Sequence, residues 1–560
     1  MRISYGWDMK FTIKSPQTSQ TIARNPDADR AALQSVAQLA QAGDMEAAAL
    51  KAAQLLQGGL EHPYLMNIVS VKLEREGNLG DALKVLSRAR QIAPTDLGVL
   101  NALGLILVRL ERPVEALEAF DTALTLDKDL PFLHASRGLA LQMVGRLDWA
   151  ETAHRRALEL WPDHPIALAG LASIASQKGD HATARELAEK VLAQHPGYAD
   201  AELTLAKADL AAKDAPAAEA RMRRQLADPR LTPLEVANAQ SALGDALDAQ
   251  GHAPEAFAAY EACNTALKSL YAPRFGGDGA RAFTQAMTRW FAQGPTWTKT
   301  PARAPRANEP RRHVFLLGFP RSGTTLLEVA LAGHPDVATL EEQDALAPAA
   351  RVFMASPALD RLTQASEREL EDLRHTYFDL CRQAGAEVAG KVFLDRFPMN
   401  TLKLPLIARL FPDAVILFAE RDPRDVVLSC FRRRFAMSAP MYEFLTLEGA
   451  ARFYDAVMGF AHKVRPVLGQ SIHTVRHEAL VADFEGEMRK ICDAIGLEFT
   501  AEMADFGART ATRAIATPST AQLTGGLSSE GVGAWRRYED QLKPVLPLLT
   551  PWVERLGYGA

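Results

Sequence analysis

Residues 313–325 combine the residue types and the spacing that bind phosphate groups. The apolar, β-prone run 313–317 leads into Gly318, and Gly323 completes the pattern G-x-x-x-x-G just before a helical stretch begins at Thr324. A strand, a glycine-containing turn and a helix N-terminus point unpaired backbone N–H groups and the positive end of the helix dipole at one spot. We therefore expect an anion to be bound by Arg321, Ser322, Gly323, Thr324 and Thr325.

This turn lacks the lysine of a nucleoside triphosphatase. Thr324 stands where the G-K-[ST] pattern has Lys, the side chain that reaches the β- and γ-phosphates. A P-loop kinase or ATPase is therefore a poor interpretation, and a nucleotide with fewer phosphates fits better. The alternative is an ordinary strand-to-helix turn, which would require all of these residue types to coincide by accident.

A second cationic group follows another apolar stretch. Arg421 comes directly after the buried strand expected at 414–420, at the edge where open α/β sheets bind ligands. Ser429 lies eight residues further, about two helical turns along the same side of a helix, so the pair can clamp one more phosphate group. Arg433, about one turn beyond Ser429, could face the same phosphate. Taken alone, Arg421 could instead be the ion-pair partner of Asp425.

These residues need a sheet to bring them together, and residues 313–560 have the pattern of one. Apolar strands alternate with helical segments, which predicts an α/β P-loop-like domain with a parallel sheet covered on both faces by helices. The expected strands are 313–317, 387–393, 414–420 and 472–476. The expected helices are one from residue 324, then 400–410, 422–435, 446–468, 484–495 and 539–556.

Residues 29–268 have a different, all-helical pattern with an internal period of 34 residues. Gly104 and Ala116 recur in phase as Gly138 and Ala150, and small residues at such positions let two antiparallel helices approach closely. The pattern resembles the tetratricopeptide repeat, a helix–turn–helix unit, and about six to seven units would stack into a solenoid with a concave groove. The resemblance implies a protein or peptide partner in that groove. An irregular helical bundle is the alternative.

The remaining segments and the composition set limits. Residues 1–28 are expected to form a flexible leader, and 269–312 a helical connection with a Pro/Arg-rich linker that could instead be a basic binding patch. The net charge of −5 gives no reason to expect nucleic acid, and no apolar run approaches the ~20 residues of a membrane span. Four cysteines without metal-ligand spacing predict no metal site and favour a reducing, cytoplasmic location.

Together the two phosphate-binding groups resemble the sulfotransferase family that uses 3′-phosphoadenosine 5′-phosphosulfate. The Pro-Arg-Ser-Gly-Thr-Thr segment 320–325 is similar to that family's 5′-phosphosulfate loop, and Arg421 with Ser429 is similar to its 3′-phosphate site. The resemblance spans nearly all of 313–560. It is strongest for the tyrosylprotein sulfotransferase type and its bacterial relatives, many of which carry tetratricopeptide repeats. It implies a donor without a γ-phosphate or a bridging metal, and a bacterial protein of the cell interior.

The resemblance also implies catalytic residues. His334 begins a segment similar to a His-Pro-Asp…Glu-Glu segment in which the second Glu removes the proton of the acceptor hydroxyl, which places that role on Glu342, with Glu341 as the second choice. A later Asp-Arg-Phe-Pro-Met-Asn segment is similar to the family's Asp-Lys-x-Pro-x-Asn, with Arg396 in place of Lys. Arg396 can stabilise charge on the leaving phosphate but cannot donate its proton, so Lys391 is the expected donor.

Three later regions also correspond to the family's pattern, and two of them depart from it in residue type. His477 stands where relatives have a Tyr that contacts the nucleotide, and it could stack on adenine or be a buried structural His. Gly531 and Gly533 lie in a Gly/Trp segment that closes over the 3′-phosphate in the family, and they could allow close backbone approach. The pair 524–525, Thr-Gly, stands in the region where relatives carry a basic residue, a contact that Arg513 could supply.

We therefore expect a sulfotransferase that moves a sulfuryl group from 3′-phosphoadenosine 5′-phosphosulfate to a hydroxyl acceptor. A peptide tyrosine is the first choice of acceptor, with the repeats recruiting a protein or peptide. The acceptor could also be a sugar, a lipid or a small phenol, because one fold serves many substrates. The alternative is a non-catalytic tetratricopeptide interaction protein whose C-terminal domain senses a nucleotide or is a degenerate remnant.

Overall fold

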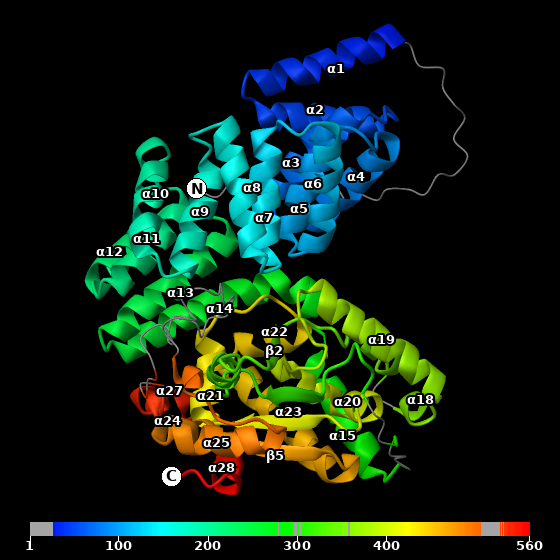
Figure 1. Cartoon of the computed structure of the whole chain (residues 1–560). Coiled ribbons are helices and arrows are strands. Elements are labelled where there is room, and N and C mark those ends of the chain that lie inside the picture. Colours follow the sequence, from blue (N-terminus) through cyan, green and yellow to red (C-terminus); the bar gives the residue numbers. More distant parts are fainter. Residues whose placement is uncertain are drawn as a thin grey trace. The chain divides into compact units, whose positions relative to one another are not determined.

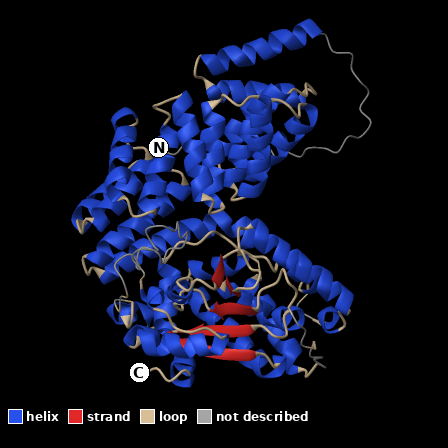
Figure 2. Cartoon of the chain, viewed as in Figure 1, coloured by secondary structure: helices blue, strands red, loops and turns tan. Residues whose placement is uncertain are grey.

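The computed structural model describes residues 26–277, 279–295, 300–301, 305–356, 359–505, 527, 529 and 531–559. The chain divides into two compact units, one of residues 1–174 with 193–195 and the other of residues 175–192 with 196–560. Helices dominate both units, and among the described residues the strands occur only in the second (Figure 2). No described helix combines the length and the apolar character needed to cross a membrane.

Fourteen consecutive helices occupy the described residues from 26 to 275 (Figure 1). They are α1 (Pro26–Gln41), α2 (Met45–Gln57), α3 (Pro63–Arg75), α4 (Leu79–Ile92), α5 (Leu97–Arg109), α6 (Pro113–Leu126), α7 (Pro131–Met143), α8 (Leu147–Leu160), α9 (Pro165–Gln177), α10 (His181–Gln194), α11 (Ala199–Ala211), α12 (Ala215–Leu226), α13 (Pro233–Ala249) and α14 (Ala253–Phe275). Several begin with Pro, whose missing N–H costs nothing in the first turn of a helix.

Glycines at the predicted repeat positions bring paired helices close together. A Cβ atom on Gly104 of α5 would lie 2.4 Å from the ring of Phe120 on α6, and one on Gly244 of α13 would lie 2.5 Å from the ring of Tyr260 on α14. Contacts this short do not occur, so only glycine lets each aromatic ring pack against the facing helix backbone. The predicted combination of small and large residues is therefore confirmed in both units.

One five-stranded parallel sheet organises the second unit. Its strands are β1 (Arg312–Gly318), β2 (Val337–Glu341), β3 (Val392–Arg396), β4 (Val415–Glu420) and β5 (Ser471–Arg476). They lie in the order β2-β3-β1-β4-β5, and every neighbouring pair is parallel. Figure 2 shows the strands of this sheet in red. The chain therefore leaves β1 toward one edge of the sheet and leaves β4 toward the other.

Different helices cover the two faces of the sheet. From β1, Phe315 and Leu317 pack into one apolar cluster, whereas Val314 and Leu316 pack into the other. Helices α19, α20, α21, α23 and α28 contribute to the first cluster, and α16, α24 and α25 contribute to the second. The predicted parallel sheet covered on both faces is confirmed.

The remaining elements of the second unit are short or lie over these faces. They are α15 (Ala280–Ala292), α16 (Thr324–Leu331), α17 (Ala347–Phe353), α18 (Asp360–Thr363), α19 (Glu367–Gln383), η1 (Pro398–Lys403), α20 (Leu404–Leu410), α21 (Pro423–Arg432), α22 (Ala439–Tyr442), η2 (Glu443–Leu445), α23 (Leu447–Leu468), α24 (His477–Ala482), α25 (Phe484–Ile495), η3 (Ala501–Ala504), η5 (Ala534–Tyr538), α27 (Glu539–Leu542) and α28 (Leu546–Arg555).

Two strands differ from the sequence prediction. The strand expected at 387–393 is β3, which begins only at Val392, because Gly390 adopts φ +68° in the turn before it. Strand β2 was not predicted, since it is short and mostly half-buried and so lacks a clear apolar pattern. Both strands end at residues that belong to the candidate site, Arg396 and Glu341.

Candidate active site

The predicted phosphate-binding groups meet at the carboxyl ends of β1 and β4. The chain leaves these neighbouring strands in opposite directions, and open α/β sheets bind ligands in the crevice outside such a point. Gly318 ends β1, and a Cβ atom on it would lie 2.6 Å from the carbonyl oxygen of Ala419 on β4. Thr401 of η1 fixes the same residue, because its hydroxyl accepts from the Gly318 N–H at 3.0 Å and donates to the Gly318 carbonyl at 2.7 Å.

The loop from Gly318 to Thr325 has an unusual backbone. Gly323 is the N-cap of α16 with φ +95°, and Arg321 has φ +71°, a left-handed conformation that a residue with a Cβ seldom adopts. Such strain persists only where the surroundings hold it, and it is concentrated at functional sites. The loop therefore presents the N-terminus of α16, together with Thr324 and Thr325, in a fixed geometry.

Two groups from a distant segment, the Arg421 guanidinium and the Ser429 hydroxyl, contact Arg321 of this loop. The Arg321 Nε donates to Ser429 Oγ at 2.9 Å, and the Arg421 Nη1 donates to the Arg321 carbonyl at 3.2 Å. Burial lowers the pKa of Arg321 to about 10, and the positive charges of Arg433 and Arg421 add to this effect. A buried guanidinium with like charges around it is a place where an anion relieves electrostatic repulsion.

A short segment, Gly531–Tyr538, closes over Arg421, and we call it the strap. The Gly531 carbonyl accepts from Arg421 Nη2. Asp425 of α21 accepts from the Gly533 N–H at 2.7 Å and from the Trp535 N–H at 2.8 Å. The N–H of Gly533 is therefore taken by Asp425, and the close approach of Gly531 and Gly533 to a 3′-phosphate stays a prediction.

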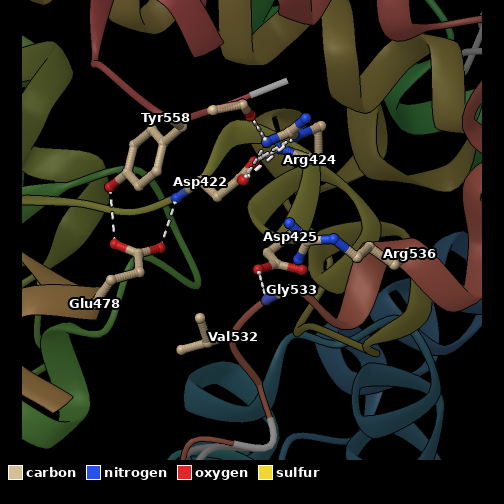
Figure 3. Close-up of a pocket in the computed structure, with 9 residues that line it drawn as sticks. Asp422, Arg424, Asp425, Glu478, Val532, Gly533, Arg536 and Tyr558 are labelled. Carbon is tan, nitrogen blue, oxygen red and sulfur yellow. Dashed lines mark hydrogen bonds and ion pairs between the residues drawn. The ribbon is translucent and has the colours of Figure 1, made fainter. Parts of the chain in front are cut away.

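A pocket of about 170 Å³ lies beside the strap (Figure 3). Glu478 accepts from the Asp422 N–H at 2.9 Å and from the Tyr558 hydroxyl at 2.8 Å. Arg424 pairs with Asp422 at 2.7 Å and donates to the Gly559 carbonyl at 2.7 Å. These pairs, drawn in Figure 3, hold the end of the chain and the start of α21 together, which assigns them a structural task at the back of the site.

His477 lies directly over the phosphate-binding loop. It begins α24, and a Cβ atom on Gly323 would lie 2.5 Å from its Nδ1. Burial, aided by the positive charges of Arg421 and Arg321, lowers the pKa of His477 to about 3, so the ring is neutral. The Nδ1 atom is buried and has no hydrogen-bond partner among the described residues. His477 is thus a neutral ring beside the loop, and its contact with adenine stays a prediction.

The candidate base lies at the end of β2. Glu342 has φ +43°, again a strained value, and its side chain is 42% exposed, against 22% for Glu341. Arg396 of β3 is fully buried and contacts both, with its Nη1 2.7 Å from Glu342 Oε1 and its Nη2 2.6 Å from Glu341 Oε1. Its Nε lies 3.8 Å from Glu328, and its Nη1 lies 3.5 Å from Thr325 Oγ1.

Arg396 is therefore surrounded by carboxylates, and its predicted contact with a leaving phosphate stays a prediction. Lys391 lies just before β3, where its Nζ donates to the Pro335 carbonyl at 2.7 Å. It is five residues, or roughly 16 Å along the strand, away from Arg396, so it cannot take the place of Arg396 at the site. Arg433 lies near Arg321, but its Nη1 faces Asp245 of α13 at 3.4 Å. Arg513 and the pair 524–525 lie outside the described residues.

Sequence reasoning missed several residues of this region. Thr401 and Glu328 act through contacts between segments far apart in the chain, and no local pattern marks them. Asp425, Glu341 and Glu342 were named from the sequence, but the contacts of Asp425 with the strap and the ion pairs of the two glutamates with Arg396 were not predicted. Lys403 of η1 was also missed, although it pairs with Asp344, two residues after Glu342. Among the described residues no group of His, Cys, Asp and Glu side chains is arranged to hold a metal ion.

A strained glycine-containing turn, a parallel sheet and two arginines at its carboxyl edge define an α/β domain of the P-loop-like class. Residues 313–501 match the model of the sulfotransferase family. Residues 71–131, 136–199 and 175–243 match models of the tetratricopeptide repeat. The chain therefore combines a sulfotransferase-family domain with tetratricopeptide repeats that precede it.

Curated relatives give the same picture at low identity. The chain is 26% identical over 264 residues to an uncharacterized protein of Aquifex aeolicus, covering 45% of this chain and 34% of that protein. It is 26% identical over 199 residues to a Caenorhabditis briggsae protein provisionally named protein-tyrosine sulfotransferase (34% and 67%), and 32% identical over 137 residues to mouse protein-tyrosine sulfotransferase 1 (22% and 35%). The chain thus spans about a third of the Aquifex and mouse proteins.

Among solved structures, a tetratricopeptide repeat protein from Parabacteroides merdae is 16% identical. It covers 43% of this chain and 93% of its own chain, with a TM-score of 0.34.

Proposed function

We propose that the C-terminal domain transfers a sulfuryl group from 3′-phosphoadenosine 5′-phosphosulfate to a hydroxyl acceptor. One observation carries the proposal: Arg421 and Ser429 contact Arg321 of the Gly318–Thr325 loop, although both follow Arg321 by 100 residues or more in the sequence. Two phosphate-binding groups at one strained turn, without the lysine that a triphosphate needs, fit a nucleotide phosphorylated at both its 5′ and 3′ positions.

The described residues fit such a donor. The amides at the N-terminus of α16, with Arg321, Ser322, Gly323, Thr324 and Thr325, would hold the 5′-phosphosulfate. Arg421 and Ser429, with Arg433, would hold the 3′-phosphate, and the buried Nε of Arg421 has no partner among the described residues. The neutral ring of His477 would stack on the base. Glu342, the more exposed of the two carboxylates on Arg396, would take the proton of the acceptor hydroxyl.

In this reaction the acceptor oxygen bonds to sulfur, the bond from sulfur to the 5′-phosphate oxygen breaks, and the acceptor proton goes to Glu342. Negative charge returns to the 5′-phosphate, where Arg321 and the loop amides stabilise it. Arg396 acts as a positioning residue, because it holds Glu341 and Glu342 in place by two ion pairs. Catalysis in this scheme is mainly positioning and charge stabilisation.

A peptide tyrosine is the proposed acceptor, and the repeats are proposed to recruit the protein that carries it. Two relatives whose names refer to protein-tyrosine sulfotransfer support this choice, as do the repeats, which commonly bind peptides and proteins. The four cysteines are all buried and unpaired, which supports a reducing compartment such as the cytoplasm.

The test is calorimetric titration with 3′-phosphoadenosine 5′-phosphate, beside AMP and ATP, on the wild type and on Arg421→Ala. The proposal expects selective binding of the bisphosphate, weakened about 10-fold or more in the variant, because a hydrogen bond to a charged group contributes roughly 1.5–3 kcal/mol. Sulfuryl transfer to tyrosine peptides, absent in Glu342→Gln, would then establish turnover. Failure to bind the bisphosphate by a folded protein would refute the proposal.

The second candidate is a nucleotide-sensing interaction protein. One observation favours it: Arg396 is buried among carboxylates, so its positive charge is not available to the phosphate that leaves in the reaction. This candidate expects tight binding of the bisphosphate and no transfer to any hydroxyl acceptor. Assays with phosphosulfate donor and a panel of phenols, sugars and tyrosine peptides separate the two.

A further inference from the structure

Two carboxylates on α13 contact the helix that carries the proposed 3′-phosphate site. Asp248 pairs with Arg432 of α21, accepts from the Tyr538 hydroxyl of the strap at 2.6 Å and lies 3.1 Å from Arg537. Its side chain is 14% exposed. One residue of the solenoid thus holds α21 and the strap against each other.

Apolar and aromatic contacts make the same connection. Phe257 of α14 stacks on Phe431 of α21 with ring centroids 4.9 Å apart, and the buried Asn264 side chain donates to the Phe431 carbonyl at 2.8 Å. The guanidinium of Arg432 lies 5.1 Å from the ring centres of both Tyr260 and Tyr538. Helices α13 and α14 therefore pack against α21 and the strap as well as forming part of the repeat array.

Asp245, one turn before Asp248, makes a looser contact. Its two oxygens lie 3.4 Å from the Arg433 Nη1, whereas a tight charge-assisted hydrogen bond measures about 2.7–2.9 Å. Both side chains are about one-third exposed. The Arg433 N–H donates to the Ser429 carbonyl, and the charge of Arg433 also acts on Arg321, so Arg433 lies near both Asp245 and the residues proposed to hold the 3′-phosphate.

We propose that Asp245 is a specificity-determining residue that competes with the nucleotide's 3′-phosphate for Arg433. This inference rests on the proposed function. Without nucleotide, Asp245 balances the charge of Arg433. A 3′-phosphate carries more charge and can make shorter hydrogen bonds, so it displaces the carboxylate. Asp245 is not stranded by this exchange, because it keeps the Tyr260 hydroxyl at 2.8 Å and the attraction of Lys207 on α11.

The exchange sets how strongly the site prefers nucleotides with a 3′-phosphate. A nucleotide without that group cannot release Arg433 and is indifferent to Asp245. A nucleotide with it binds against the competition of the carboxylate. Removing the charge of Asp245 therefore strengthens binding of the bisphosphate alone, and it places one solenoid residue in control of nucleotide choice.

The experiment is titration of the full chain with 3′-phosphoadenosine 5′-phosphate and with AMP. Asp245→Asn is expected to tighten the bisphosphate about two- to five-fold, the range for partly exposed ion pairs, and to leave AMP unchanged. In an Arg433→Ala background Asp245→Asn is expected to change neither. Asp245→Glu, which keeps the charge, is expected to match the wild type.

Asp121→Asn is the matched control, because it breaks another solenoid Asp–Arg pair, 2.6 Å from Arg137 in the first unit. It is expected to change neither nucleotide. Weaker or unchanged bisphosphate binding in Asp245→Asn, or an equal change for AMP, would overturn the inference. A wild type that does not distinguish the bisphosphate from AMP would overturn the proposed function, and this inference with it.

Discussion

Asp425→Asn is the sharpest test of how the strap is held. The carboxylate is 1% exposed and accepts two strap amides, from Gly533 at 2.7 Å and from Trp535 at 2.8 Å. Asparagine has nearly the same shape but offers one oxygen and one NH₂ group. The N–H of either Gly533 or Trp535 would then face the NH₂ group of the new asparagine, a second donor, inside the protein.

The size of the effect follows from these two contacts. A hydrogen bond to a charged group contributes about 1.5–3 kcal/mol, a neutral one about 1, and a buried donor left without an acceptor costs a further 1–3. The variant replaces two charge-assisted bonds by one neutral bond, a loss of ~2–5 kcal/mol, and the unpaired donor adds to this loss. At about 1.4 kcal/mol per factor of ten, the strap of the variant opens at least ~30-fold more often.

Hydrogen exchange read by mass spectrometry measures this opening, because exchange of a bonded amide requires the contact to break. The peptide that contains Gly533 and Trp535 is expected to exchange at least 30-fold faster in Asp425→Asn. Asp540→Asn is the control, since Asp540 lies on the next helix and only pairs with Lys543 at the surface. Unchanged exchange in the Asp425 variant, or equally faster exchange across the whole second unit, would refute the local pinning.

Three further changes test the loop and the strand ends. Gly323→Ala places a Cβ atom against His477 at a left-handed position, so we expect at least a 10-fold loss of nucleotide affinity by calorimetry, and wild-type affinity would contradict the close approach. Arg396→Met leaves the fully buried Glu328 and the partly exposed Glu341 and Glu342 without this counter-ion, so denaturant unfolding is expected to show a loss of ~3 kcal/mol or more, with a smaller loss in Arg396→Lys; equal losses would argue against a charge effect. Burial raises the pKa of Asp395 to about 7. Between about pH 4 and pH 7 the folded chain therefore keeps a proton that the unfolded chain has released, so the free energy of unfolding falls as the pH rises through this range. Relative to wild type, Asp395→Asn should remove ~3 kcal/mol of that fall between pH 4.5 and 7.5, and parallel pH profiles would exclude Asp395 as its source.

Local chemistry allowed much of the fold to be predicted from the sequence. The phosphate loop was predictable because a strand, two glycines and a helix start lie within thirteen residues. The repeats were predictable because Gly104 and its equivalents recur every 34 residues. Arg421 and Ser429 were found because one strand and one helix carry them, and strand ends in such sheets face ligands.

Other parts of the site depend on contacts that no local pattern records. The ion pairs of Arg396 were not predicted, because its partners Glu328, Glu341 and Glu342 lie more than fifty residues earlier in the chain. Asp245 looked like an ordinary surface residue of a repeat helix, because its partner Arg433 is 188 residues away in sequence. Strand β2 was missed because half-buried residues give a weak alternation.

The strand order has a consequence for how the protein is made. Strand β1 lies at the centre of the sheet, but both of its neighbours, β3 and β4, come 70 to 100 residues later in the chain. At roughly 5–20 residues per second, a ribosome needs several seconds or more to complete that stretch. During this time both edges of an apolar strand have no partner, while the repeats, whose contacts are local, can already fold. Newly made chains are therefore most prone to aggregate, and most in need of a chaperone, between the synthesis of β1 and that of β4.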